Sequence, residues 1–558
     1  MQHSMDSYFN YKRRQTSQAT IGEGVTIGGE APIRIQSMAN VPLTDVKGAV
    51  EQSIRMIEAG SELVRFAAPG EREALILREV RAQLEALGYN TPLVADIHFN
   101  ANAARVAATT VQKVRINPGN FASNKKTQEE RFLELLAICR KHNTALRIGV
   151  NHGSLSERMK EKYGNTPKGL VESCMEFLQM CKQENFPNVV ISVKSSNTNV
   201  MVQTVRLMIS RMEEENMNYP LHLGVTEAGE GEDGRIKSAV GIGALLADGI
   251  GDTIRVSLSE APEAEIPVAQ SLVNYIQMRE GHPPIEGVRC TNFDYIQPLR
   301  RKSIPLKGIG GDTLPAVIAT PEVFQATQTS ALKPDFSSDE SFFVQMKAED
   351  LTAERIACLQ RKANDTVLIL STKHVNYVGA MRAAIHRIMI AQWDIPLILC
   401  REMNEPDKDK AQLIAAADFG VLLMDGFCDG IMLVNPLLDA EAVCAIQFGI
   451  LQATRVRISK TDYISCPTCG RTMFNLQDTI VRVKAATKHL KGLKIAVMGC
   501  VVNGPGEMAD ADYGCLGAGR DKVSLFRGKE CIERNVPQQA AAERLLELIY
   551  KDQSTNPR

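Results

Sequence analysis

The chain has 558 residues, with 64 Lys and Arg against 65 Asp and Glu, which gives a net charge of -1. This length is enough for several domains, each with its own core. The balanced charge favours neither nucleic acid nor a membrane surface as a partner, so any basic site has to be local. No apolar run approaches the roughly 18 residues of a membrane span, and the N-terminus lacks a signal-peptide pattern, so we expect a cytoplasmic protein.

Between residues 30 and 280, short β-rich runs alternate with amphipathic helical stretches, which is the pattern of βα units around a parallel sheet. Eight strands, the number that closes a TIM barrel, are expected at residues 33–38, 63–67, 92–97, 113–117, 146–150, 189–194, 221–226 and 253–258. Helices are expected between them, for example at 45–59, 71–87, 128–141 and 167–183. The sequence therefore predicts an α/β fold that begins with a TIM barrel over residues 1–285.

Polar side chains gather at the carboxyl ends of these strands, which in a barrel converge on one mouth. Five of them are cations: Arg65, Arg115, Arg147, Lys194 and Arg255. In one interpretation each cation pairs with a carboxylate of a neighbouring loop. In the other they bind phosphate, since a hydrogen bond to a charged group contributes about 1.5–3 kcal/mol. Five cations at equivalent positions favour a small phosphorylated ligand.

The pattern of predicted strands and helices changes between residues 286 and 455. Strand-like runs at 366–370, 396–400 and 420–424 flank helical stretches at 374–392 and 441–452. These strands are too few to close a barrel. We expect an inserted, incomplete and barrel-like α/β domain that acts as a spacer.

Residues 456–558 are expected to form a compact α/β domain, with helices near 478–490 and 538–550 and strands near 494–498 and 522–526. Cys466 and Cys469 form a C-x2-C pair, and Cys500 brings a third thiol from a separate segment. Thiolates in this arrangement bind soft metals. Cys515 would complete a structural zinc site, whereas Glu507 would leave an iron–sulfur cluster with one displaceable oxygen ligand.

The other cysteines show no framework of paired positions. The chain has 13 cysteines, an odd number, and five of them lie in apolar helical contexts: Cys139, Cys174, Cys181, Cys358 and Cys444. Cysteines of this kind are typical of buried thiols in a reducing compartment rather than of disulfides. We expect these five to be buried.

Several segments resemble the signature blocks of the 4-hydroxy-3-methylbut-2-enyl diphosphate synthase family. In the predicted barrel they are DIHF at 96–99, RINPGN at 115–120, RIGVN at 147–151, SVKSS at 192–196, LHLGVTEAG at 221–229 and GDTIRVS at 251–257. In the C-terminal region they are SCPTCGR at 465–471 and MGCVVNGPGE at 498–507. The resemblance covers both ends of the chain. It implies a TIM barrel and a 4Fe-4S domain, here with a domain inserted between them.

The resemblance also implies an oxidoreductase of the non-mevalonate isoprenoid pathway. Its reaction is the two-electron reductive ring opening of 2-C-methyl-D-erythritol 2,4-cyclodiphosphate, with loss of water. By the family's pattern, one 4Fe-4S cluster is held by Cys466, Cys469, Cys500 and Glu507. The diphosphate is held by Arg65, Arg115, Arg147, Asn151, Lys194, Arg255 and Ser257, while Glu227 is the acid/base. A ferredoxin or flavodoxin is the expected electron donor.

Other readings stay open at this point. A phosphate-ligand TIM-barrel lyase or aldolase would use Lys194 as a Schiff base and carry a structural zinc tail. A non-catalytic scaffold would use the inserted domain as its main partner-binding surface. Asp96 and His98 would either position substrate or be packed loop residues. The cluster domain would serve its own barrel or that of a second subunit in a homodimer.

Overall fold

In the computed structural model, which describes residues 8–122, 125–361, 365–502 and 504–555, the chain divides into two compact units. The first unit comprises residues 15–234, 251–270 and 460–558, and the second comprises 1–14, 235–250 and 271–459. Two helices, α8 (Gly231–Ala247) and α9 (Pro262–Gln277), pass from one unit to the other.

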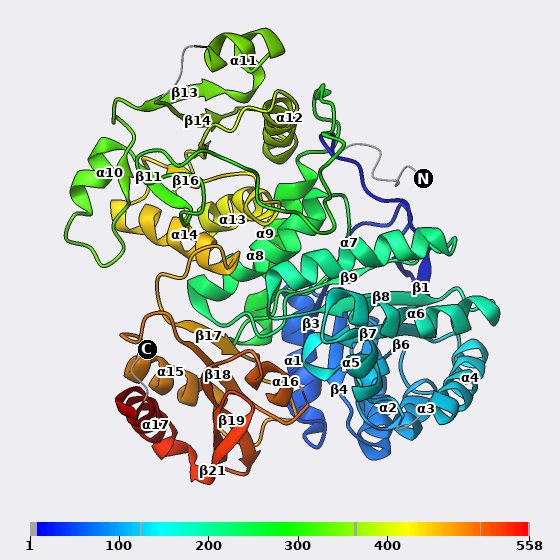
Figure 1. The fold of residues 1–558 in the computed structure, drawn as a ribbon. Helices are drawn as coiled ribbons and strands as arrows, with labels where there is room; N and C mark the ends of the chain where they lie inside the picture. Colours follow the sequence, from blue (N-terminus) through cyan, green and yellow to red (C-terminus); the bar gives the residue numbers. More distant parts are fainter. Residues whose placement is uncertain (1–7, 123–124, 362–364, 503, 556–558) are drawn as a thin grey trace. The chain divides into compact units, whose positions relative to one another are not determined.

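The first unit contains a barrel of parallel strands (Figure 1). The eight strands follow the order β8-β7-β6-β5-β4-β3-β10-β9, and a bridge between Ile191 and Leu221 joins the two ends of the sheet. Their bounds are β3 (Arg34–Met38), β4 (Leu63–Ala67), β5 (Leu93–Asp96), β6 (Lys113–Ile116), β7 (Ala145–Asn151), β8 (Val189–Lys194), β9 (His222–Leu223) and β10 (Thr253–Ile254). Each of the eight predicted strands is confirmed, and so is the TIM barrel.

Helices follow the barrel strands along the chain. They are α1 (Val46–Glu58), α2 (Glu71–Ala86), α3 (Ala101–Ala107), α4 (Lys125–His142), α5 (Glu157–Tyr163), α6 (Pro167–Gln183) and α7 (Thr198–Glu214). Local chemistry sets where they begin. Asp45 caps α1 by accepting a hydrogen bond from the Gly48 amide at 2.9 Å, and Thr166 caps α6 in the same way ahead of a proline at the first helical position. The four predicted helices are confirmed.

A hairpin of β1 (Ala19–Ile21) and β2 (Val25–Ile27) precedes the barrel. Its buried side chains Ala19, Ile21 and Ile27 pack with Leu63, Val94, Ala145 and Val190, which lie at or near the amino ends of their strands. The hairpin therefore covers the amino-terminal end of the barrel with an apolar cluster. In TIM barrels the active site usually lies at the carboxyl ends of the strands.

The rest of the first unit, which we call the C-terminal sheet domain (residues 460–558), is a mixed sheet in the order β17-β18-β19-β20-β21. Its strands are β17 (Asp462–Ser465), β18 (Lys494–Met498), β19 (Tyr513–Gly519), β20 (Lys522–Arg527) and β21 (Glu530–Pro537). Its helices are α15 (Leu476–Thr487), α16 (Gly504–Met508) and α17 (Ala541–Thr555). The predicted helices and strands of this region are confirmed, whereas β17, β19 and β21 were not anticipated.

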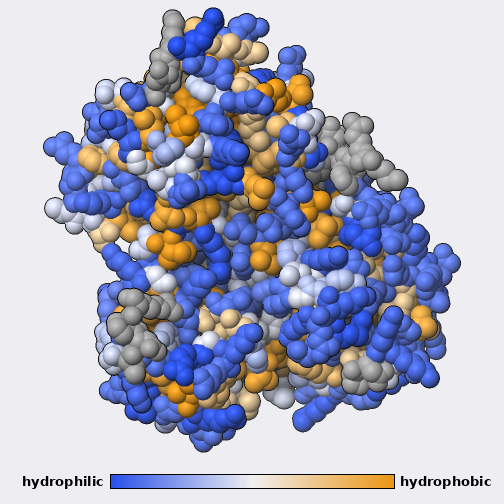
Figure 2. Space-filling model, in the orientation of Figure 1, coloured by the Kyte–Doolittle hydropathy of each residue, from blue (hydrophilic) through white to orange (hydrophobic). Residues whose placement is uncertain are grey.

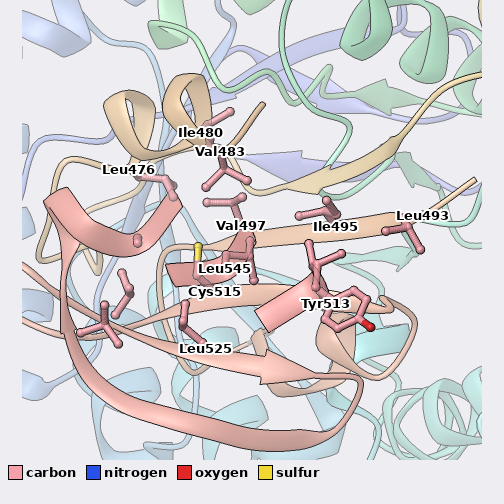
Figure 3. Close-up of a cluster of buried hydrophobic side chains, with 14 of the residues drawn as sticks. Leu476, Ile480, Val483, Leu493, Ile495, Val497, Tyr513, Cys515, Leu525 and Leu545 are labelled. Atoms are coloured by element: carbon pink, nitrogen blue, oxygen red, sulfur yellow. The ribbon is translucent and has the colours of Figure 1, made fainter. Parts of the chain in front are cut away.

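Cys515 lies in the hydrophobic core of this domain, among side chains such as Val497, Leu476 and Leu525 (Figure 3). It faces Val497 in the pairing of β18 with β19, and it is fully buried. Burial raises the pKa of its thiol to about 12. Cys515 is therefore a core residue.

The second unit contains an open sheet of parallel strands in the order β12-β11-β16-β15-β14-β13. The strands are β11 (Ala316–Ala319), β12 (Phe336–Ser337), β13 (Phe343–Lys347), β14 (Val367–Ser371), β15 (Leu397–Glu402) and β16 (Gly430–Val434). The helices are α10 (Pro321–Ala326), α11 (Ala353–Gln360), α12 (Tyr377–Ile390), α13 (Lys408–Met424) and α14 (Ala440–Ala453). The incomplete α/β fold expected for the inserted region is confirmed, with both of its predicted helices.

The strand predicted at 420–424 is wrong, because these residues form the end of α13. Asp407 caps this helix by accepting hydrogen bonds from the amides of Asp409 (2.8 Å) and Lys410 (3.2 Å). A short apolar run fits a buried helix as well as a buried strand, and its periodicity cannot separate the two. The strand of this region, β16, lies six residues further along the chain.

All 13 cysteines are free thiols. Four of the five that we expected to be buried are buried, namely Cys139, Cys174, Cys181 and Cys444, whereas Cys358 is half-buried. None of the described helices is both long and apolar enough to cross a membrane. Hydrophilic residues predominate on the face shown in Figure 2, and hydrophobic residues form small scattered groups there.

Candidate functional site

The carboxyl ends of the barrel strands meet a cavity that the C-terminal sheet domain also lines. From the barrel, the lining includes Arg65, Arg115, Arg147, Asn151, Lys194, Glu227, Arg255 and Ser257. From the C-terminal sheet domain, it includes Cys466, Cys469 and Cys500. All the predicted site residues except Glu507 are therefore brought together around one space.

Two of the five cations are held by carboxylates. Arg255 donates two hydrogen bonds to Glu265, from Nε at 3.0 Å and from Nη2 at 2.8 Å. Arg115 donates to Asp96 Oδ1 at 2.7 Å and to the carbonyl oxygen of Gly149 at 2.8 Å. The interpretation of these cations as ion-paired barrel residues is correct for Arg115 and Arg255, whose guanidinium groups are fixed in place.

The other three cations, Arg65, Arg147 and Lys194, have no carboxylate within 4.0 Å among the residues that the structure describes. The Arg65 guanidinium lies against Met38, with Nη2 2.8 Å from the sulfur. Two nitrogens of Arg147, which is 1% exposed, have no hydrogen-bond partner. Burial and neighbouring cations together lower the pKa of Arg65 to about 9, against the opposing charge of Asp96. The same two causes hold the pKa values of Arg147 and Lys194 well below their usual range. Such a cluster needs an anion, and phosphate oxygens suit its donors.

Asp96 links the barrel to the C-terminal sheet domain. Its carboxylate accepts a hydrogen bond from Arg471 Nη2 at 3.1 Å as well as the bond from Arg115. Burial alone would raise its pKa, but the charges of Arg115 and Arg65 help to outweigh burial and hold the pKa well below the usual range. The carboxylate therefore stays ionised and connects two arginines from different domains.

His98 lies beside this pair, with its Nε2 against Arg115 and its Nδ1 3.1 Å from Asn120 Nδ2. Burial, followed by the charge of Arg115, lowers the pKa of His98 to about 3, so the ring is neutral. A neutral ring in contact with a site arginine helps to orient that arginine.

Arg471 was not among the residues predicted for the site, although it lines the cavity. Its only signal in the sequence is its position at the end of the C-x2-C-G-R run.

Glu227 occupies a strained backbone position at the cavity. Its φ angle is +50°, in the left-handed region that residues other than glycine rarely adopt, and the residue is 3% exposed. The next residue, Ala228, forms a parallel bridge with Ser465, directly before Cys466. Strained backbone conformations persist only where the surrounding structure enforces them, and they are common at functional sites.

Three thiols, those of Cys466, Cys469 and Cys500, line the cavity. The interaction between the side chains of Cys469 and Cys500 lowers the pKa of Cys469 and raises that of Cys500. The Gly499 amide donates to Cys466 Sγ at 3.1 Å. Three soft donors from two loops suit a metal–sulfur group.

Among the described residues, no three His, Cys, Asp or Glu side chains are arranged to hold one metal ion. A multi-iron cluster does not require that arrangement, since its ligands are shared among several irons. A zinc ion would need four ligands around one point, and the core position of Cys515 argues against that thiol as the fourth. The donors therefore fit an iron–sulfur cluster better than structural zinc.

Glu507 lies on α16, beside the barrel rather than on the wall of the cavity. It is 2% exposed, and its Oε2 accepts a hydrogen bond from Ser196 Oγ at 2.6 Å. Ser196 follows β8, two residues after Lys194. The position of Glu507 is thus set partly by a barrel residue.

Further contacts join the barrel to the C-terminal sheet domain of the same chain. Asn40 Nδ2 donates to Thr468 Oγ1 at 3.0 Å, and Ser259 Oγ donates to the carbonyl oxygen of Cys466 at 3.2 Å. The candidate site is therefore assembled within one chain.

Two family models match the chain: the GcpE TIM-barrel domain over residues 16–270 and the GcpE protein C-terminal domain over residues 462–551. Similar curated proteins are named 4-hydroxy-3-methylbut-2-en-1-yl diphosphate synthase (flavodoxin). The protein from Parabacteroides distasonis is 53% identical over 98% of this chain and 99% of its own length. Those from Bacteroides fragilis strain ATCC 25285 (49%; 97% and 96%) and Leptospira interrogans (36%; 97% and 97%) are also similar over nearly their full lengths.

Among solved structures, a dihydropteroate synthase from Xanthomonas albilineans matches 48% of this chain and 100% of its own, with 15% identity and a TM-score of 0.34. A TM-score this low supports no conclusion about fold or function.

Proposed function

Because the chain belongs to the GcpE family of 4-hydroxy-3-methylbut-2-en-1-yl diphosphate synthases, we propose that its cavity is the active site for that synthesis. The enzyme is an oxidoreductase of isoprenoid precursor formation. It opens the ring of 2-C-methyl-D-erythritol 2,4-cyclodiphosphate with two electrons, and one hydroxyl leaves as water.

One observation carries this proposal: buried cations without carboxylate partners share a cavity with three thiols. Arg65, Arg147 and Lys194 bind the diphosphate, together with the ion-paired Arg115 and Arg255. Asn151 and Ser257 add neutral hydrogen bonds. When the ring opens, negative charge grows on the departing diphosphate, so the same cations lower the barrier as well as bind the substrate.

Cys466, Cys469, Cys500 and Glu507 would hold one 4Fe-4S cluster. When bound, the cluster supplies electrons one at a time and a Lewis-acidic iron. Glu227 lines the same cavity, and we assign it the proton transfer to the departing hydroxyl. Asp96 keeps Arg115 and Arg471 in place on either side of the domain boundary.

The names of the relatives specify flavodoxin, and we therefore propose flavodoxin rather than ferredoxin as the electron donor. Contacts between the barrel and the C-terminal sheet domain within one chain favour a cluster that serves its own barrel. The homodimer, the cytoplasmic location and the domain limits 1–285, 286–455 and 456–558 stay predictions.

Iron analysis after anaerobic purification tests this function. We expect about four irons per chain and conversion of the cyclodiphosphate by reduced flavodoxin, because a cubane cluster carries four irons. Stoichiometric zinc with only trace iron would contradict the assignment. A borohydride-trapped substrate adduct on Lys194 would instead favour the lyase or aldolase.

A further inference from the structure

A barrel hydroxyl holds the carboxylate of Glu507. Ser196 is fully buried and Glu507 is 2% exposed, and the bond from Ser196 Oγ to Glu507 Oε2 is 2.6 Å long. The two residues lie 311 positions apart in the sequence, one in the barrel and one in the C-terminal sheet domain. A buried hydrogen bond to a charged group is among the stronger ones in a protein.

The backbone around Glu507 also rests on the barrel. A Cβ atom added to Gly506 would lie 2.0 Å from the carbonyl oxygen of Gly153 and 2.3 Å from its Cα. The contact is between two main chains and has no flexible side chain that could move aside. Docking of the C-terminal sheet domain therefore sets where α16 lies, and with it where the Glu507 carboxylate can reach.

We propose that Ser196 is a positioning residue that holds the carboxylate of Glu507 away from the iron when the two domains dock. This inference rests on the proposed function, in which Glu507 is the exchangeable ligand of the cluster. Ser196 and the iron then compete for the carboxylate of Glu507. The hydrogen bond to Ser196 favours the state in which Glu507 is not bound to the iron, so that the substrate can bind the iron in its place. A ligand that needs this state binds more weakly when the state is less populated.

The variant Ser196→Ala removes the hydroxyl. The matched control is Ser195→Ala, because Ser195 is also fully buried but, among the described residues, its hydroxyl is bonded only to the Asn197 amide of its own loop (3.1 Å). Both proteins are loaded with ⁵⁷Fe and titrated with the cyclodiphosphate without a reductant. Mössbauer spectra then follow the iron that changes its ligands, independently of turnover.

For Ser196→Ala we expect an unchanged iron content and a half-saturation concentration at least roughly tenfold above that of the wild type, the scale of one charged hydrogen bond. Ser195→Ala should titrate like the wild type. Gly506→Ala tests the same inference from the other domain and should shift the titration in the same direction.

Equal titrations of Ser196→Ala and the wild type would overturn the inference while leaving the proposed function intact. Loss of iron from Ser196→Ala would also overturn it, since the hydroxyl would then support the ligated state. A wild type that binds no iron would refute the proposed function, and the inference with it.

Discussion

Replacing the buried cation Arg147 should raise the stability of the free enzyme and lower its affinity for the substrate. Arg147→Met replaces a guanidinium that is 1% exposed and has two nitrogens without hydrogen-bond partners. A buried ion without a partner costs several kcal/mol of desolvation free energy, and an apolar side chain of similar volume does not carry this cost. The free enzyme should therefore melt at a higher temperature, while affinity for the diphosphate falls by about 1.5–3 kcal/mol, or roughly 10- to 100-fold.

Arg255→Met is the matched control, because Arg255 lines the same cavity but is paired with Glu265. This substitution leaves the Glu265 carboxylate, 2% exposed, without its guanidinium. Breaking a buried pair costs about 3–5 kcal/mol, so this variant should melt lower.

The assays for this pair are thermal unfolding of the ligand-free proteins and titration calorimetry with the cyclodiphosphate. An Arg147→Met protein that loses as much stability as Arg255→Met would refute the reasoning, because Arg147 would then have a stabilising partner in the free enzyme.

Three other predictions concern individual residues. Glu227→Gln should lower kcat by roughly a hundredfold or more with little change in KM, the usual effect of removing a general acid, and a mainly raised KM would argue against that role. Cys466→Ser should lose the cluster and activity together, whereas Cys515→Ala should keep its iron, because Cys515 lies in the core; iron analysis and the visible absorption spectrum separate the two. His98, with its pKa near 3, is neutral in the folded state, whereas the unfolded chain takes up a proton below about pH 6.5. His98 should therefore cost the wild type about 1.4 kcal/mol of stability per pH unit as the pH falls from about 6.5 towards 3, and the stability of His98→Gln should fall less steeply in urea unfolding.

The barrel could be predicted from the sequence because each strand is a short β-rich run with a helix after it. The run at 420–424 could not be assigned correctly, since apolar residues without alternation suit a buried helix equally well. Strands such as β12 and β9, with two residues each, carry too little pattern to define their bounds.

Much of the site was also accessible from the sequence, because equivalent strand ends of a barrel meet at one mouth. The division of its cations into paired and unpaired ones was not accessible. Glu265, the partner of Arg255, lies ten residues further along the chain, in α9, and nothing in its local sequence marks it. The contact of Glu507 with Ser196 was likewise hidden, because it depends on how two domains dock.

Several hydrogen bonds join the barrel to the C-terminal sheet domain. They link Asn40 with Thr468, Asp96 with Arg471, and Ser259 with Cys466. An interface held by hydrogen bonds can separate at modest cost in free energy, because water satisfies the separated polar groups. It re-forms in one arrangement, because each polar group has a specific partner. Substrate could then enter and product leave when the barrel and the C-terminal sheet domain separate. Since both halves belong to one chain, they would meet again at a high effective concentration, whatever the dilution of the enzyme.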